Sequence, residues 1–213
     1  DFGHILAENL TLHVENFVMN SDSIGGLITE GKLREKNGFV LNELQGDILY
    51  AFNQAYAKGL HIVTPGTDIK RNIILEYASY DALIDEFDKT MMDVELVNSK
   101  VQVKDILAFA PDLRREPAFS NPNETWYLNI VANGNLNHLS FETLEFDGLR
   151  NTQIDARGTL AGLTNPTSAS GTFTINRLRT TQSDIALFTG KRLSTPDLNL
   201  PESFEVTGTL SGN

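Results

Sequence analysis

The sequence Ile154-Asp155-Ala156-Arg157-Gly158-Thr159-Leu160 decides the fold of this chain. Its apolar residues and its glycine occupy alternate positions, so in an extended strand they share one face, while Asp155, Arg157 and Thr159 share the other. Alternation with a period of two is typical of a half-buried strand. The segment therefore predicts a sheet with one apolar face and one polar face.

The same pattern occurs three times in the second half of the chain, which makes it an internal repeat. Its glycines are Gly134, Gly158 and Gly208, the first two 24 positions apart and the last 50 positions further on. We therefore expect an antiparallel meander built from units of about 25 residues. A glycine on the inner face favours bending of the sheet, or it marks a bulge in an ordinary sandwich core.

An apolar sheet face has to be covered. The sheet can fold over on itself, pack against a helix or a second sheet, or hold an apolar ligand. The alternation leaves these possibilities open.

The first half of the chain predicts hairpins. Asn37-Gly38 supplies the positive φ angles of a tight turn, so strands over 24–35 and 39–50 should pair antiparallel. A second turn at Thr64-Pro65-Gly66 separates two further strands. The chain is therefore predicted to be mainly β.

Two short helices are predicted in the same half. Ser79 or Asp81 can cap a helix whose apolar residues recur at spacings of three and four up to Met91. Its acidic side chains should form a solvated face. A shorter helix is expected over 104–110, and it should stop before Pro111.

The proline-rich segment 111–123 is a candidate linker. It separates a mixed first part, residues 1–110, from an almost purely β second part, residues 124–213, although one continuous sheet also fits the pattern. The chain begins at Asp1 and shows no signal-like segment. We therefore expect a piece of a larger chain or a processed chain.

Composition excludes several functions. The chain has 213 residues, a formal net charge of -11 and no cysteine. The negative charge makes nucleic acid a poor partner, and the lack of cysteine excludes disulfides and thiolate zinc sites. No stretch approaches the ~20 apolar residues of a membrane helix. By area scaling a compact chain of this size buries roughly 70% of its surface, which predicts a sizeable core.

No catalytic or metal-binding motif stands out. The histidines His4, His13, His61 and His138 are scattered, without metal-ligand spacing. No nucleophile elbow, phosphate-binding loop or zinc-protease motif is present. We therefore predict no catalytic residues, no metal, no cofactor and no enzymatic activity.

Several motifs resemble a known family. They are Glu35–Phe39, with its Glu-Lys-x-Gly-Phe turn, Val63–Gly66 with its Thr-Pro turn, Asp105–Pro111, and Gly158–Leu163 within the glycine series. Together they resemble the repeat modules of the AsmA-like superfamily, in particular the large envelope proteins of the translocation and assembly module type (TamB-like). The resemblance covers nearly the whole chain.

The resemblance implies a long antiparallel sheet curled into a U-shaped, taco-like groove that conducts phospholipid to the outer membrane. The parent protein would lie in the periplasm, anchored in the inner membrane outside this segment. The implied partners are phospholipid acyl chains and an outer-membrane β-barrel protein. The inner-register residues would then line the groove: Leu128, Ile130, Ala132, Leu136, Ile154, Ala156, Leu160, Phe173, Ile175, Phe204, Val206 and Leu210.

Two other functions remain open. In one, the chain is a non-enzymatic scaffold whose exposed strand edge pairs with a client β-protein, and the apolar face is plain core. In the other, Trp126 and Tyr127 form the aromatic platform of a carbohydrate-binding domain. Adjacent strand residues point to opposite faces, so this platform would be thin.

Overall fold

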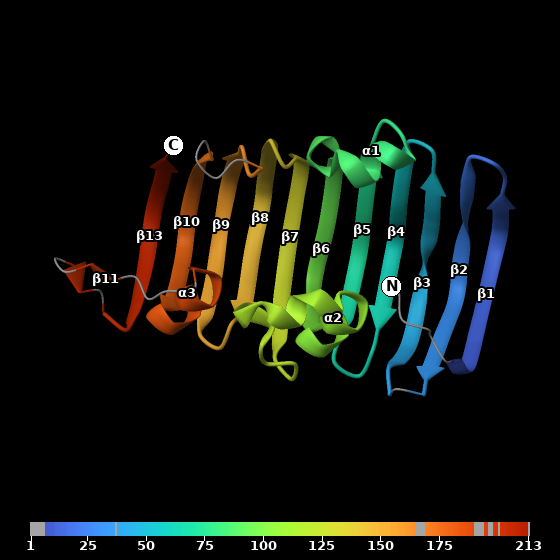
Figure 1. Cartoon of the computed structure of the whole chain (residues 1–213), viewed down its shortest axis with the longest axis horizontal. Helices are drawn as coiled ribbons and strands as arrows, with labels where there is room; N and C mark the ends of the chain where they lie inside the picture. The colour runs from blue at the N-terminus through green and yellow to red at the C-terminus, as the bar shows by residue number, and fades with distance from the viewer. Residues whose placement is uncertain are drawn as a thin grey trace.

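The computed structural model describes residues 7–36, 38–164, 169–189, 194–195, 198–199 and 201–212. Asn37 of the expected hairpin turn and His4 lie outside these residues. An 11-stranded antiparallel sheet, with its strands in chain order, forms the body of the protein (Figure 1). Its strands are β1 Ala7–Met19, β2 Ser23–Glu35, β3 Val40–Ala51, β4 Gln54–Val63, β5 Asp68–Glu76, β6 Met91–Gln102, β7 Thr125–Asn135, β8 His138–Gly148, β9 Thr152–Ala161, β10 Ser170–Thr181 and β13 Ser203–Gly212.

Helices are short and lie at the strand ends (Figure 1). The α-helices are α1 Tyr80–Asp85, α2 Val103–Phe109 and α3 Gln182–Thr189. Three 3-10 turns accompany them, η1 Phe87–Lys89, η2 Pro111–Arg115 and η3 Pro117–Phe119, and a small hairpin joins β11 Ser194–Thr195 to β12 Leu198–Asn199.

The mainly β prediction and the antiparallel meander are confirmed. The hairpin of β2 and β3 forms with Glu35 donating its N–H to the carbonyl oxygen of Phe39. The turn at Thr64-Pro65-Gly66 joins β4 to β5. The strands on either side of segment 111–123 are hydrogen-bonded neighbours, from Met92 opposite Gly134 to Gln102 opposite Thr125, so the sheet runs past this segment.

The two predicted helices form, but the first is shorter than its pattern indicates. Ser79 caps α1, its hydroxyl accepting the N–H of Ala82 at 3.1 Å. The helix ends at Asp85, and Met91 is already the first residue of β6, where it pairs with Glu76. Pairing with β5 therefore overrides the helical spacing of the apolar residues. Helix α3 was not predicted.

The repeat also needs a correction. Gly134, Gly158 and Gly208 lie on β7, β9 and β13, which are equivalent strands of the meander. The interval of about 25 residues between the first two is one hairpin. The double interval before Gly208 contains β10, α3 and the segment that leads to β13.

Residues directly opposite each other in a strand pair have side chains on the same face. The described pairings connect one row of apolar residues and glycines from β2 to β13. We call the side of the sheet that carries this row the apolar face. The row is Gly26, Ile48, Ala57, Ile73, Val94, Ala132, Phe141, Gly158, Phe173 and Leu210.

This single sheet buries little surface. The chain exposes 13283 Å², against roughly 9,800 Å² for a compact monomer of its mass by area scaling. The expectation of a sizeable core is therefore wrong. Among the described residues no second large sheet packs on the first, which excludes the sandwich interpretation.

Gly158 allows the two strands on either side of it to approach closely in the middle of the row. Its neighbours across β8 and β10 are Phe141 and Phe173, whose ring centroids lie 6.1 Å apart. A Cβ at Gly158 would lie 2.1 Å from the carbonyl oxygen of Thr172, and φ is +157°. Only glycine lets the two aromatic strands approach this closely.

We predict that Gly158→Ala lowers the free energy of unfolding by at least about 3 kcal/mol, because it adds a steric clash to an unfavourable φ. The matched control is Gly208→Ala, since Gly208 has φ +135° and open space where its Cβ would be. This control should lose about 1 kcal/mol. Urea unfolding followed by circular dichroism measures both, and equal losses would contradict the close-approach argument.

Candidate functional site

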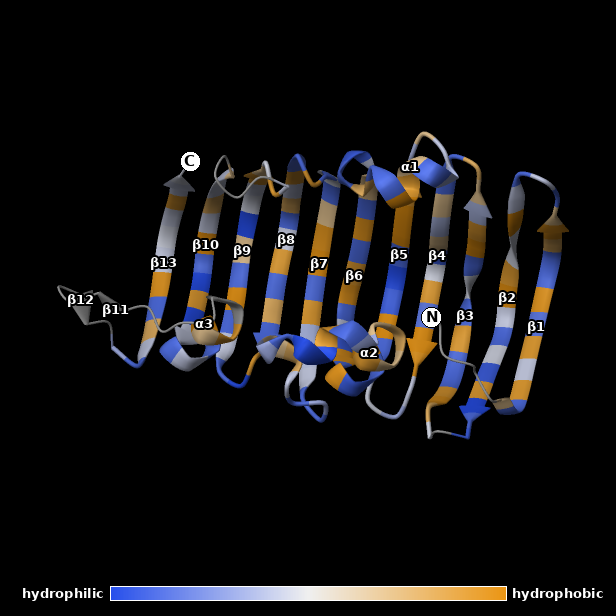
Figure 2. Cartoon of the chain, viewed as in Figure 1, coloured by the Kyte–Doolittle hydropathy of each residue, from blue (hydrophilic) through white to orange (hydrophobic). Residues whose placement is uncertain are grey.

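The apolar face is the candidate site, and Figure 2 shows the alternation of hydrophobic and hydrophilic residues along its strands. The structure brings most of the predicted lining residues together on this face. Ile154, Ala156 and Leu160 of β9 stand opposite Leu178, Ile175 and Gly171 of β10. Leu136 is the exception: it lies beyond the end of β7, and Leu139 of β8 stands opposite Gly134 instead.

The predicted residues differ in exposure. Ala132, Ala156 and Ile175 are buried by their lateral neighbours. Val206 and Leu210 on β13 are 41% and 63% exposed. The other predicted lining residues are half-buried, so strong exposure within this set is confined to the edge strand β13.

The sequence analysis did not identify many of the residues that form the apolar face. Strand β8 contributes Leu139, Phe141, Leu144 and Phe146, and the first half of the chain contributes the rows of β2 to β6. The period-two signal is present there, but register shifts interrupt it. Such shifts occur between Ile28 and Gly31, and between Leu96 and Ser99. Each shift is typical of a bulge, after which the alternation resumes in another phase.

Helix α1 borders the apolar face at one end of the strands. Tyr80 packs against Tyr50 at 5.0 Å and against Phe52 at 5.7 Å between ring centroids. Tyr50 stands opposite Ile24 and Ala55, so it belongs to the apolar face. Helix α1 therefore lies on the apolar side of the sheet.

The opposite strand ends are bordered by α2, η2 and η3. Phe119 of η3 packs on Trp126, and Trp126 packs on Phe146, with centroid distances of 5.1 and 5.8 Å. Trp126 precedes Leu128 by two positions, so its ring lies on the apolar side. Both borders therefore rise on the same side, and the described helices leave the strand centres uncovered.

A buried carboxylate anchors α2 to this edge. Asp105 accepts hydrogen bonds from the hydroxyls of Thr64 and Thr67 at 2.5 and 2.6 Å. The hydroxyl of Thr67 in turn accepts the N–H of Gln102, the residue that precedes the helix. The Thr-Pro turn and the Asp motif of the sequence are thus two halves of one contact.

Helix α3 repeats this anchor. Asp184 accepts hydrogen bonds from the hydroxyl of Thr152 at 2.9 Å and the N–H of Asn151 at 3.0 Å. The sequence Asp105-Ile106-Leu107-Ala108-Phe109 returns as Asp184-Ile185-Ala186-Leu187-Phe188. Each Asp is the third residue of a helix that follows a strand.

We predict that Asp105→Ala lowers the free energy of unfolding by about 2–3 kcal/mol, because two buried hydroxyls lose a charged acceptor. Asp112→Ala is the matched control, since Asp112 is exposed on the neighbouring turn η2. It should change stability by less than about 0.5 kcal/mol. Thermal unfolding of both variants checks this, and a stable Asp105→Ala protein would show that the anchor is dispensable.

The polar face is linked by ion pairs across strands. His61 on β4 contacts Glu43 of β3 through Nδ1 at 3.2 Å and Asp68 of β5 through Nε2 at 3.0 Å. Partial burial acts to raise the pKa of Asp68, but hydrogen bonds from Lys70 and His61 outweigh it and hold that pKa below its usual value. These pairs stabilise the sheet modestly, because they are partly exposed.

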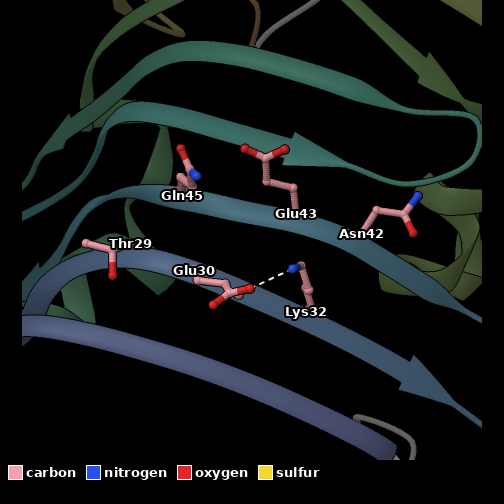
Figure 3. Close-up of a pocket in the computed structure, with 7 residues that line it drawn as sticks. Thr29, Glu30, Lys32, Asn42, Glu43 and Gln45 are labelled. Carbon is pink, nitrogen blue, oxygen red and sulfur yellow. Dashed lines mark hydrogen bonds and ion pairs between the residues drawn. The ribbon is translucent and has the colours of Figure 1, made fainter.

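A shallow depression of about 370 Å³ lies on this polar face, between β2 and β3. Figure 3 shows Glu30 and Lys32 from β2, joined by an ion pair of 2.6 Å, beside Asn42, Glu43 and Gln45 of β3. The lining is polar and open. It does not connect with the apolar face, which lies on the other side of the same sheet.

The aromatic platform does not form. Trp126 packs within the apolar side, whereas Tyr127 is 56% exposed and stands opposite Asp147 on the polar face. Among the described residues no three His, Asp or Glu side chains gather in a way that could hold a metal ion. The side chains of the apolar face can therefore make non-directional contacts with an apolar ligand.

Comparisons with protein families, with curated proteins and with solved structures found no match. In the part of the chain that the structure describes, no helix has the length and apolar character needed to cross a membrane.

Proposed function

We propose that this chain is a lipid-conducting module whose sheet curls into a groove for acyl chains. The observation that carries this proposal is the continuous apolar row from β2 to β13, whose strand centres are not crossed by any described helix (Figure 1). An apolar sheet face without a second layer packed on it is a surface on which an apolar ligand can bind. Here the surface runs across the strands, in the direction in which a chain of lipid molecules would travel.

Two features support a curled shape. Register shifts in successive strand pairs give each strand a local bend, and bulges increase twist and curvature. The helices at both strand ends lie on the apolar side, where they would form the two walls of a groove. The two glycines of the row, Gly26 and Gly158, would let the sheet bend without steric conflict.

The mechanism needs no reacting group. Each CH₂ that leaves water contributes about 0.8 kcal/mol. Because apolar contacts lack direction, neighbouring positions along the row have similar energies, and a lipid can slide while its head group stays wet. A concentration gradient or an energy source outside this chain would give the movement its direction.

The resemblance to AsmA-like proteins supports a place for this module in the bacterial envelope. The parent protein would lie in the periplasm, anchored in the inner membrane outside this segment, and would bring phospholipid to the outer membrane. In this proposal the chain is not an enzyme.

Photo-crosslinking in cells tests the groove. The photoreactive residue p-benzoylphenylalanine is placed at Ile154 on the apolar face and, as matched control, at Asp155 on the polar face; both are half-buried on β9. We expect phospholipid adducts, identified by mass spectrometry, at Ile154 and none at Asp155. A folded protein without adducts at either position would contradict lipid conduction.

A second function is favoured by the edge of the sheet. All residues of β1 are exposed, and among the described strands only β2 pairs with it. Such an edge can add a strand from another protein. We therefore keep as alternative a strand-pairing scaffold that assists the assembly of an outer-membrane β-barrel protein.

Proline variants on β1 test the scaffold. Thr11 and Leu12 are adjacent, so the N–H of one points toward β2 and that of the other points outward. We expect a proline at whichever of Thr11 and Leu12 has the outward N–H to abolish binding of an unfolded β-barrel protein that is diluted from urea. The fold of this chain should remain intact. A proline at the other position removes an N–H that points toward β2, so this variant measures how much stability is lost when the β1–β2 ladder is broken. Unchanged client binding by the outward variant would sink the scaffold function.

A further inference from the structure

The two helical borders of the apolar face carry different charges. Helix α1 and turn η1 hold the acids Asp81, Asp85, Glu86 and Asp88. Their cation, Lys89, is already paired with Glu86 at 2.9 Å. This border therefore repels anions.

The border formed by α2 and η2, at the opposite strand ends in Figure 1, presents available cations. Lys104, Arg114 and Arg115 are exposed, and no ion pair engages their side chains within the part of the chain that the structure describes. Asp112 and Glu116 flank the two arginines and lower the local charge without pairing with them. Guanidinium groups match phosphate oxygens with two parallel hydrogen bonds.

An exposed aromatic ring belongs to the same border, five positions from Lys104 and five from Arg114 in the sequence. Phe109, the last residue of α2, is 73% exposed, yet its ring contacts Phe39 edge-on at 5.5 Å between centroids. An apolar ring on a border that carries cations fits the junction between an acyl chain and a charged head group. On the acidic border the exposed apolar residues include Ile84, at 76%, and Phe87, at 42%, and their neighbours there are carboxylates rather than free cations.

Resting on the function proposed above, we infer that the α2–η2 border is a head-group site for the phosphate of a phospholipid. Arg114, Arg115 and Lys104 contact the phosphate, and Phe109 contacts the first carbons of the acyl chains. The acidic α1 border keeps phosphate away, so that the head groups line up along one side.

Dimensions agree with a one-sided arrangement. A strand of 12 residues, such as β3 or β6, spans about 40 Å. The acyl region of one bilayer leaflet is about 15 Å thick. A lipid whose head group sits at the α2–η2 border therefore covers somewhat more than a third of the strand length and does not reach α1.

The test compares two fluorescently labelled lipids with identical acyl chains, a phosphatidylglycerol and a diacylglycerol, titrated into the 213-residue chain. The variant is Arg114→Gln with Arg115→Gln. The matched control is Arg157→Gln with Arg179→Gln, which removes the same charge from exposed positions on the polar face. We expect the first variant to bind phosphatidylglycerol roughly tenfold more weakly, with unchanged binding of diacylglycerol, and the control to bind both lipids as the parent chain does.

The outcomes distinguish the head-group site from the proposed lipid-conducting function. Equal losses in both variants would reduce the effect to net charge, and unchanged phosphatidylglycerol binding in the first variant would remove the head-group site while lipid binding stands. Competition by inorganic phosphate that is as strong, mole for mole, as competition by unlabelled phosphatidylglycerol at constant ionic strength would mean that the border takes free phosphate, which overturns the lipid assignment. If the parent chain binds neither lipid, the proposed function itself fails.

Discussion

The whole structure depends on the backbone hydrogen bonds between neighbouring strands. In most domains a second layer buries one face of a sheet, and that burial contributes most of the stability. Here the described helices lie only at the strand ends, and the side chains of the apolar face pack sideways within one layer. The ladder of main-chain hydrogen bonds must therefore keep every strand in register, because a shift by one residue would turn the apolar row toward the polar side.

Lateral packing in a single layer places unusual demands on side-chain size. Ala132, Ala156 and Ile175 are buried, and apolar residues of the neighbouring strands stand opposite them, such as Phe141 opposite Ala132 and Leu144 opposite Ala156. Gly158 has no side chain at all, and two phenylalanine rings from the flanking strands stand opposite it. The polar face is organised differently, by pairs such as Asn129 with Glu145 and Asn176 with Asp155, which join neighbouring strands through hydrogen bonds.

Much of the fold could be predicted from the sequence, because its main signal is local. Alternation over Ile154–Leu160 defines a strand and its two faces without knowledge of any partner. The signal fails where long-range pairing decides the outcome: Met91 fits a helix by spacing but pairs with Glu76, and bulges hide the apolar rows of β2 to β6. The anchor of α2 was equally out of reach, since Thr64 and Asp105 lie 41 positions apart and only the fold brings them together. For the site, the period-two pattern located the apolar face but could not show that it would stay uncovered.

The strand count has a consequence for how sheets of this kind can be extended. With 11 antiparallel strands in chain order, the two edge strands β1 and β13 run in the same direction (Figure 1). If two copies were placed side by side by simple translation, β13 of one copy would lie next to β1 of the other, and the two strands would be parallel. Antiparallel continuation between copies requires like edges to meet about a twofold axis normal to the sheet, which also keeps both apolar faces on one side. An odd-numbered meander therefore extends by rotation, with a separate twofold axis at each edge, whereas an even-numbered one can extend by translation.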